Sequence, residues 1–162
     1  MIVEIIIILV SVLLSAFFSG MEIAFVSANK MHIELVKKKD NLLAKILTRL
    51  TQKPSKFITT MLVGNNIALV IYGYFMGDVL MQLFGNNIQN EFLLLLTQTF
   101  ISTIIILVSA EFLPKAVFRI YSNEMLKIFA IPSYFFYVTF YFFSQFIILI
   151  SDFFLTKLFL YL

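Results

Sequence analysis

The sequence holds 162 residues, of which 61% are hydrophobic, 17% aromatic and only 13% charged. A soluble globular domain is about 45–50% apolar and about 25% charged, so this chain has too little polar surface to cover its apolar residues in water. The composition excludes a soluble domain and predicts a single all-α membrane domain over 1–162. Because the chain contains no cysteine, disulfides and thiolate metal sites are also excluded.

The first predicted membrane span covers 5–28 and opens with the run IIIILVSVLLSAFF. The run continues beyond the apolar region of a signal peptide, and Glu4 stands where a basic region belongs, so we expect a retained helix. Polar residues recur every three or four positions and therefore share one helical face. These residues are Ser11, Ser15, Ser19 and Glu22. Close packing between membrane helices remains an alternative role for the serines.

Between residues 29 and 53, apolar residues recur at roughly helical spacing among lysines. This pattern is typical of two short amphipathic helices at a membrane surface. The segment from Ala28 to Lys56 carries eight basic residues against two acidic ones. Such an excess marks cytoplasmic loops, so we expect the N-terminus outside and this segment inside. Since the basic residues flank apolar spans, membrane orientation explains them, and nucleic acid is not an expected partner.

The second predicted span covers 57–84 and contains a polar interruption, Gly64-Asn65-Asn66, within an apolar run. These residues lie about 12–15 Å beyond Lys56 along a helix. Each asparagine offers a carbonyl oxygen that can bind a hard cation, and the glycine permits local distortion. We favour this role over hydrogen bonding between helices, which is the alternative.

The third predicted span covers 92–114, follows the loop 84–91 that lacks lysine and arginine, and ends in the motif SAEFLPK. Proline has no N–H group, so we expect Pro114 to interrupt the helix and to deprive the Ala110 carbonyl of its helical partner. A free oxygen would then adjoin the carboxylate of Glu111. In the alternative, this carboxylate is solvated near the interface, since a straight helix places it roughly 28 Å along the span.

The segment 128–151 has 24 residues without a charge, which by length alone predicts a fourth span. It carries Pro132 near its start and then the aromatic run YFFYVTFYFF. Two placements remain open. The segment either crosses the membrane, which hydropathy favours, or lies as a bent helix against the bundle on the cytoplasmic side.

Hydroxyl, carboxamide, main-chain and carboxylate oxygens on three spans form a set of hard ligands. Such a set favours Mg²⁺ or Ca²⁺, with Na⁺ as a further option, over a soft metal. Enzymatic chemistry has little support, because His32 is the only histidine and no phosphate-binding glycine loop is present. We therefore predict that the chain is not an enzyme.

Three motifs together resemble the membrane domain of the CNNM/CorC family of magnesium transporters. They are LLSAFFSGMEIAF at 13–25, MLVGNNIAL at 61–69 and SAEFLPKAV at 109–117. The resemblance implies a homodimer in the cell membrane with three transmembrane helices per subunit and a cytoplasmic helix-turn-helix over 29–53. It also implies a belt-like juxtamembrane helix over 120–160, which would lie along the bundle rather than cross the membrane.

The resemblance further implies export of Mg²⁺, exchanged for Na⁺, from a site open to the cytoplasm. The residues at the matching motif positions would form this site: Ser15, Ser19, Gly64, Asn65, Asn66, Ala110 and Glu111. A non-transporting membrane interaction module, whose polar residues only join helices, is the alternative. A transporter of another cation is a third hypothesis.

The sequence departs from the family pattern in three ways. Ala110 stands where the family usually has glycine, so we expect less unwinding there, and Met21 stands where a small polar residue is frequent. Family members normally continue into paired cytoplasmic CBS domains that bind nucleotide, whereas this sequence ends at Leu162. The sequence is thus expected to be either part of a longer chain or a domain without that regulation.

Overall fold

The computed structural model describes residues 2–39 and 41–160, with side chains as far as Phe154, and every regular element in these ranges is a helix. This confirms the predicted all-α class. Three helical runs are long and apolar enough to cross a membrane, as predicted. They are α1 (Ile2–Ser27), α4 (Pro54–Phe84) and the continuous run Glu91–Ile120.

Asparagine side chains begin three of the helices. Asn29, Asn41 and Asn90 each accept hydrogen bonds from main-chain N–H groups in the first helical turn that follows them. A capping oxygen of this kind satisfies amides that have no partner within the helix. The helices that begin in this way are α2 (Lys30–Lys37), α3 (Leu42–Gln52) and α5 (Glu91–Ile106).

The third membrane run is not a uniform α-helix. After α5 it widens into a π-helical turn, η1 (Leu107–Phe112), and then continues as α6 (Leu113–Ile120). The N–H group of Leu113 bonds to the carbonyl of Val108, five residues earlier. Pro114 occupies the first turn of α6, where its missing N–H group is tolerated, so it does not end the helix as the sequence suggested.

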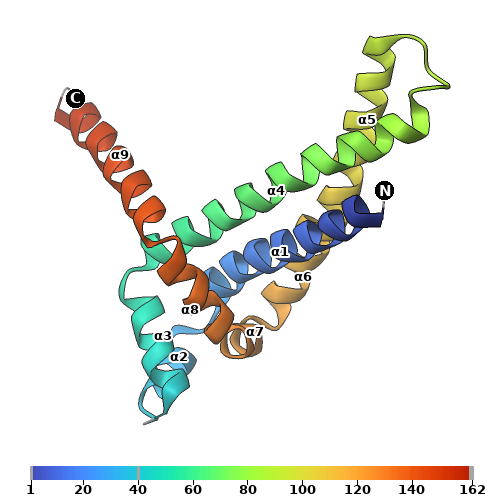
Figure 1. Ribbon diagram of the computed structural model, residues 1–162. Coiled ribbons are helices and arrows are strands. Elements are labelled where there is room, and N and C mark those ends of the chain that lie inside the picture. The colour runs from blue at the N-terminus through green and yellow to red at the C-terminus, as the bar shows by residue number, and fades with distance from the viewer. Residues whose placement is uncertain (1, 40, 161–162) are drawn as a thin grey trace.

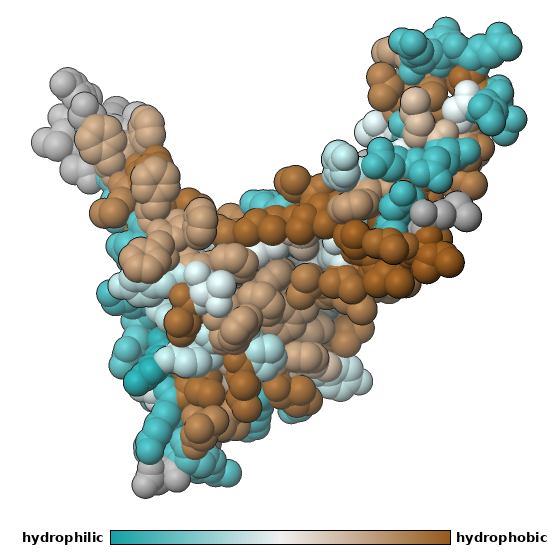
Figure 2. All heavy atoms as spheres, in the orientation of Figure 1, coloured by the Kyte–Doolittle hydropathy of each residue, from teal (hydrophilic) through white to brown (hydrophobic). Residues whose placement is uncertain are grey.

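Helix α1 lies at the centre of the molecule. It packs against α4 along one side and against η1 and α6 along another (Figure 1). We call the end that carries residues 28–56 the basic end, and the end that carries the loop between α4 and α5 the loop end. Figure 2 shows hydrophilic residues gathered at these two ends, with hydrophobic residues covering much of the face between them. This distribution is the one expected of a bundle surrounded by lipid.

The main core lies towards the basic end. It brings together residues of α1, α3 and α4, among them Met21, Leu50, Phe57 and Met61, all of which are fully buried. A smaller cluster around Tyr72, Met76 and Leu80 packs α4 against α1 and α5 nearer the loop end. The main core therefore ties the short helices of the basic end to the membrane bundle.

The C-terminal part contains three helices: α7 (Ser122–Ile128), α8 (Ala130–Thr139) and α9 (Tyr141–Leu160). Helix α8 packs against α3 and α4 at the basic end. The axes of α8 and α9 differ by 69°, and the pair is apolar enough to form one broken span or a re-entrant segment. In Figure 1, α9 leaves the bundle at the basic end and points away from α4. The belt-like placement stays a prediction.

Candidate ion site

The serine face of α1 is turned into the bundle. Ser15 and Ser19 are 0% exposed, and Ser11 is also buried. The hydroxyl of Ser15 donates a hydrogen bond to Oδ1 of Asn65 over 2.6 Å, and the hydroxyl of Ser19 donates to the main-chain carbonyl of Ala110 over 2.6 Å. Oxygen atoms from α1, α4 and η1 therefore meet along one side of α1. We call these four oxygens the oxygen row.

Two glycines permit this close approach of the helices. A Cβ atom at Gly64 on α4 would lie 2.5 Å from the ring of Phe18 on α1. A Cβ atom at Gly20 on α1 would lie 2.7 Å from the ring of Phe118 on α6. Because neither distance leaves room for a methyl group, the two glycines allow α4 and α6 to pack tightly against α1 beside the oxygen row.

The π-helical turn presents the Ala110 carbonyl to α1. The imide nitrogen of Pro114 carries no hydrogen, so the carbonyl four residues earlier has no α-helical partner. Ser19 supplies a hydrogen bond instead, and Ala110 is fully buried. The wider turn is present although position 110 is alanine rather than glycine. π-Helical turns within α-helices frequently occur at functional sites.

The structure separates the two asparagines. Asn65 is buried and bonded to Ser15, whereas the neighbouring Asn66 is exposed in the single chain. Consecutive helical residues point in directions about 100° apart, so both amides cannot face the same partner helix. Of this pair, only Asn65 contributes to the oxygen row.

The carboxylate of Glu111 lies at the edge of the bundle. Its side chain is 31% exposed, and Oε2 lies 3.5 Å from Nζ of Lys115 one helical turn later. Glu22, on the polar face of α1, is half-buried. The structure thus brings Ser15, Ser19, Asn65 and the Ala110 carbonyl together, with Gly64 in support. It places the Asn66 amide and the Glu111 carboxylate outside this group.

The oxygen row itself carries no formal charge. Among the described side chains, which lie within 2–39 and 41–154, no three His, Cys, Asp or Glu residues gather in a way that would hold a metal ion. Neutral hydroxyl and carbonyl oxygens bind hard cations less strongly than a cluster of carboxylates does. Weak binding suits an ion that must leave again. Glu111 adjoins the row through its peptide bond with Ala110.

Two features near the basic end escaped sequence reasoning. Lys56 is 3% exposed, and its ammonium lies 2.9 Å from the ring centre of Tyr141. The hydroxyls of Thr60 and Ser144 lie 2.8 Å apart and join α4 to α9. Lys56 and Thr60 are four residues apart and therefore lie on one face of α4. This spacing is the signal in the sequence that could have indicated a buried polar contact there. Their partners lie more than 80 residues away along the chain.

Comparison with known proteins places these helices in a family. The family described as the Cyclin M transmembrane N-terminal domain, CNNM, matches residues 5–159. The chain belongs to the CNNM family. This confirms the resemblance seen in the sequence motifs. The matched residues include every helix that contributes to the oxygen row.

Two curated bacterial proteins are similar to this CNNM domain. The UPF0053 inner membrane protein YfjD of Escherichia coli K12 is 31% identical over 112 residues, which are 69% of this chain and 25% of that protein. The UPF0053 protein MG146 of Mycoplasma genitalium is 30% identical over 142 residues, which are 83% of this chain and 32% of that protein. The chain thus spans about a third or less of the length of these relatives.

Proposed function

We propose that this CNNM domain transports Mg²⁺ out of the cell in exchange for Na⁺, as a homodimer. The observation that carries the proposal is the pair of 2.6 Å contacts that bring oxygens of α1, α4 and η1 together inside the bundle. Membership of the CNNM family supports a transporter-like role. The excess of basic residues supports a cytoplasmic position for the basic end.

The spacing of the oxygens suits a small cation. In an octahedral shell with Mg–O distances of about 2.0–2.1 Å, neighbouring oxygens lie roughly 2.9 Å apart. The hydrogen-bonded pairs Ser15–Asn65 and Ser19–Ala110 are already 2.6 Å apart. An ion that binds between the two oxygens of either pair would therefore separate them by a few tenths of an ångström and rotate the hydroxyl proton away. Each oxygen then offers a lone pair to the ion.

Glu111 supplies the negative charge in this mechanism. Mg²⁺ gives up water reluctantly and is usually bound through one or two carboxylates. In the structure, the ammonium of Lys115 lies 3.5 Å from the Glu111 carboxylate and compensates its charge. When Mg²⁺ enters, the carboxylate turns from Lys115 towards the ion, which already contacts the adjoining Ala110 carbonyl. Departure of the ion returns Glu111 to Lys115.

Asn66 supports the homodimer. An exposed carboxamide well inside a membrane span is costly when it faces hydrocarbon. Asn66 is exposed on α4 of the single chain. A second copy that covers this face would provide hydrogen-bond partners for the amide. Asn66 thus serves assembly in this proposal, whereas Asn65 serves the ion.

The same contacts also favour one alternative. A hydrogen bond from Ser15 to Asn65 and another from Ser19 to Ala110 join helices, as expected in a membrane interaction module that moves no ion. The two functions differ in one measurable respect. A transporter is stabilised by its ion, whereas a module held together by hydrogen bonds alone does not respond to Mg²⁺.

A thermal-shift titration with MgCl₂ on the purified protein, followed by Mg²⁺ flux in liposomes, tests the proposal. Asn65→Ala and Asn66→Ala are matched variants. Each removes one carboxamide from α4, but the Asn65 amide is buried against α1 whereas the Asn66 amide is exposed. We expect Asn65→Ala and Glu111→Gln to weaken Mg²⁺-dependent stabilisation at least tenfold and to stop flux. Asn66→Ala should retain the Mg²⁺ response. At a concentration one hundred times Kd, bound Mg²⁺ should stabilise the wild type by about 2.7 kcal/mol.

Two outcomes would contradict the proposed Mg²⁺ transport. Absence of any Mg²⁺ effect on wild-type melting would favour the interaction module. If Asn65→Ala kept the full Mg²⁺ response, the oxygen row would not be the Mg²⁺-binding site. Competition with Ca²⁺ and Na⁺ in the same titration identifies the preferred ion.

A further inference from the structure

The helices of the basic end carry a second polar surface, separate from the oxygen row. A cavity of about 490 Å³ opens beside α2 and α3. Among the described residues, five cationic side chains line it and no acidic side chain does. They are Lys37, Lys38, Lys39, Lys45 and Arg49. We call this surface the basic cleft.

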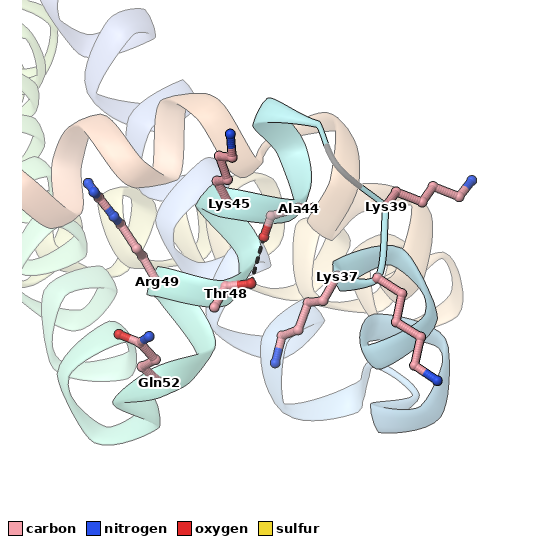
Figure 3. A pocket seen from close by; sticks show the side chains of 8 residues that line it. Lys37, Lys39, Ala44, Lys45, Thr48, Arg49 and Gln52 are labelled. Carbon is pink, nitrogen blue, oxygen red and sulfur yellow. Dashed lines mark hydrogen bonds between the residues drawn. The ribbon is translucent and has the colours of Figure 1, made fainter.

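Figure 3 shows how the cationic groups of the basic cleft are disposed. The amino groups of Lys39, in the turn after α2, and Lys45, on α3, extend in different directions rather than towards one point. Lys37 forms an ion pair with Glu34 over 2.7 Å, and the Arg49 guanidinium donates a hydrogen bond to the Tyr134 hydroxyl. The arrangement therefore suits several separate anionic groups better than one small anion.

Large apolar side chains lie exposed among these lysines. Met31 is 75% exposed, and Leu35 and Leu42 are also exposed. An amphipathic helix that combines basic and apolar side chains in this way is typical of the boundary between lipid headgroups and acyl chains. A soluble polyphosphate or nucleic acid would neutralise the lysines and leave these apolar groups in water.

The position of the two helices agrees with such a boundary. Residues 28–29 join α2 to α1, and Lys53 joins α3 to α4. Both α1 and α4 are long and apolar enough to cross the membrane. The basic cleft is therefore tethered by short connections to the ends of two spans, where headgroup phosphates are the anions within reach.

We propose that α2 and α3 bind the anionic phospholipid headgroups of the leaflet at the basic end. The lysines of the basic cleft contact several phosphates, and Met31, Leu35 and Leu42 enter the upper acyl region. Clusters of lysine and arginine beside a membrane span recognise anionic lipids through charge attraction. This inference does not depend on Mg²⁺ transport, since none of these residues belongs to the oxygen row.

Retention of lipid by the whole chain tests the proposal. The protein is purified from mixed phosphatidylglycerol and phosphatidylcholine, and the bound lipids are counted by native mass spectrometry. We expect the variant Lys38→Gln/Lys39→Gln/Lys45→Gln to lose roughly a hundredfold in apparent affinity for phosphatidylglycerol, because each lysine near an anionic surface contributes about fivefold. The control Arg119→Gln/Lys127→Gln removes two charges on α6 and α7, outside the two helices proposed to bind lipid, and should retain the lipid.

A second measurement needs no variant. Phosphatidylglycerol should raise the melting temperature of the wild type more than phosphatidylcholine does, and high NaCl should remove the difference because charge attraction is screened. Equal stabilisation by the two lipids would refute the proposal. Stronger stabilisation by ATP or inorganic phosphate than by the anionic lipid would also refute it and would assign the cleft to a soluble anion. Mg²⁺-dependent stabilisation should be unchanged in the triple variant and in the control.

Discussion

Gly64 on α4 packs against the ring of Phe18 on α1. The edge of the buried Phe18 ring fills the space that a side chain at position 64 would occupy. A Cβ atom at Gly64 would lie 2.5 Å from this ring. We expect Gly64→Ala to destabilise the protein by roughly 1–3 kcal/mol, because overpacking forces either the ring or the helix to move. Thermal melting of the purified variant measures this effect.

Gly73 provides the matched control on the same helix. Among the described residues, a Cβ atom there meets nothing within 4 Å apart from its chain neighbours and the backbone of its own helix. Gly73→Ala should therefore leave the melting temperature unchanged or raise it, since alanine favours a helix by about 1 kcal/mol over glycine. If both variants melted at the same temperature, the proposed contact between Gly64 and Phe18 would be wrong.

At the residue scale, the sequence predicted which polar residues lie on the spans but not all of the directions in which their side chains point. Periodicity placed Ser15 and Ser19 on one face, and the structure buries both against other helices. Which asparagine faces α1 depends on the rotation of α4 about its own axis. That rotation is set by contacts such as Gly64 with Phe18, which join residues far apart in sequence. No local pattern contains this information.

The π-helical turn is the element that connects the third span to the oxygen row. In this turn the Ala110 carbonyl accepts a hydrogen bond from the Ser19 hydroxyl. Pro114 has no N–H group, so it cannot donate the α-helical hydrogen bond to that carbonyl. We expect Pro114→Ala to supply an N–H group that competes with Ser19 and draws η1 towards a regular α-helix. Mg²⁺-dependent stabilisation should then weaken about tenfold, and the new amide at position 114 should be protected from hydrogen exchange.

Pro54→Ala is the corresponding control. Pro54 begins α4 at a position where an N–H group has no helical partner, so its replacement restores no hydrogen bond. The Mg²⁺ response should be the same as in the wild type. Rapid exchange at position 114 together with a normal Mg²⁺ response in Pro114→Ala would show that the proline does not control the Ala110 carbonyl.

The helices themselves could be predicted because their causes are local. Long apolar runs lie within the helices that they form, and the capping asparagines directly precede the helices that they cap. The form of the distortion in the third span could not be predicted. Pro114 indicated a break, but whether the helix ends, kinks or widens there depends on contacts such as the hydrogen bond from Ser19 to the Ala110 carbonyl, which joins residues 91 positions apart.

At the scale of the whole molecule, composition and charge already separate a lipid-covered bundle from a basic end. The structure also shows where the C-terminal helix α9 begins. Ser144, in the first turns of α9, contacts Thr60 near the start of α4, and Tyr141 covers the ammonium of Lys56. Helix α9 therefore begins at the basic end, directly after the 69° bend. Figure 1 shows it pointing away from α4 rather than along it.

These contacts lead to a prediction about topology. A helix that starts at the basic end and turns away from the spans should run along the membrane surface, where the charge of the exposed Asp152 remains in water. Since the chain contains no cysteine, Asp152→Cys introduces a single reactive thiol. We expect a membrane-impermeant maleimide to label it only from the cytoplasmic side, whereas Asn86→Cys at the loop end should react from outside. Labelling of Asp152→Cys from outside would instead make α8 and α9 a broken fourth span, with the C-terminus across the membrane from the basic end.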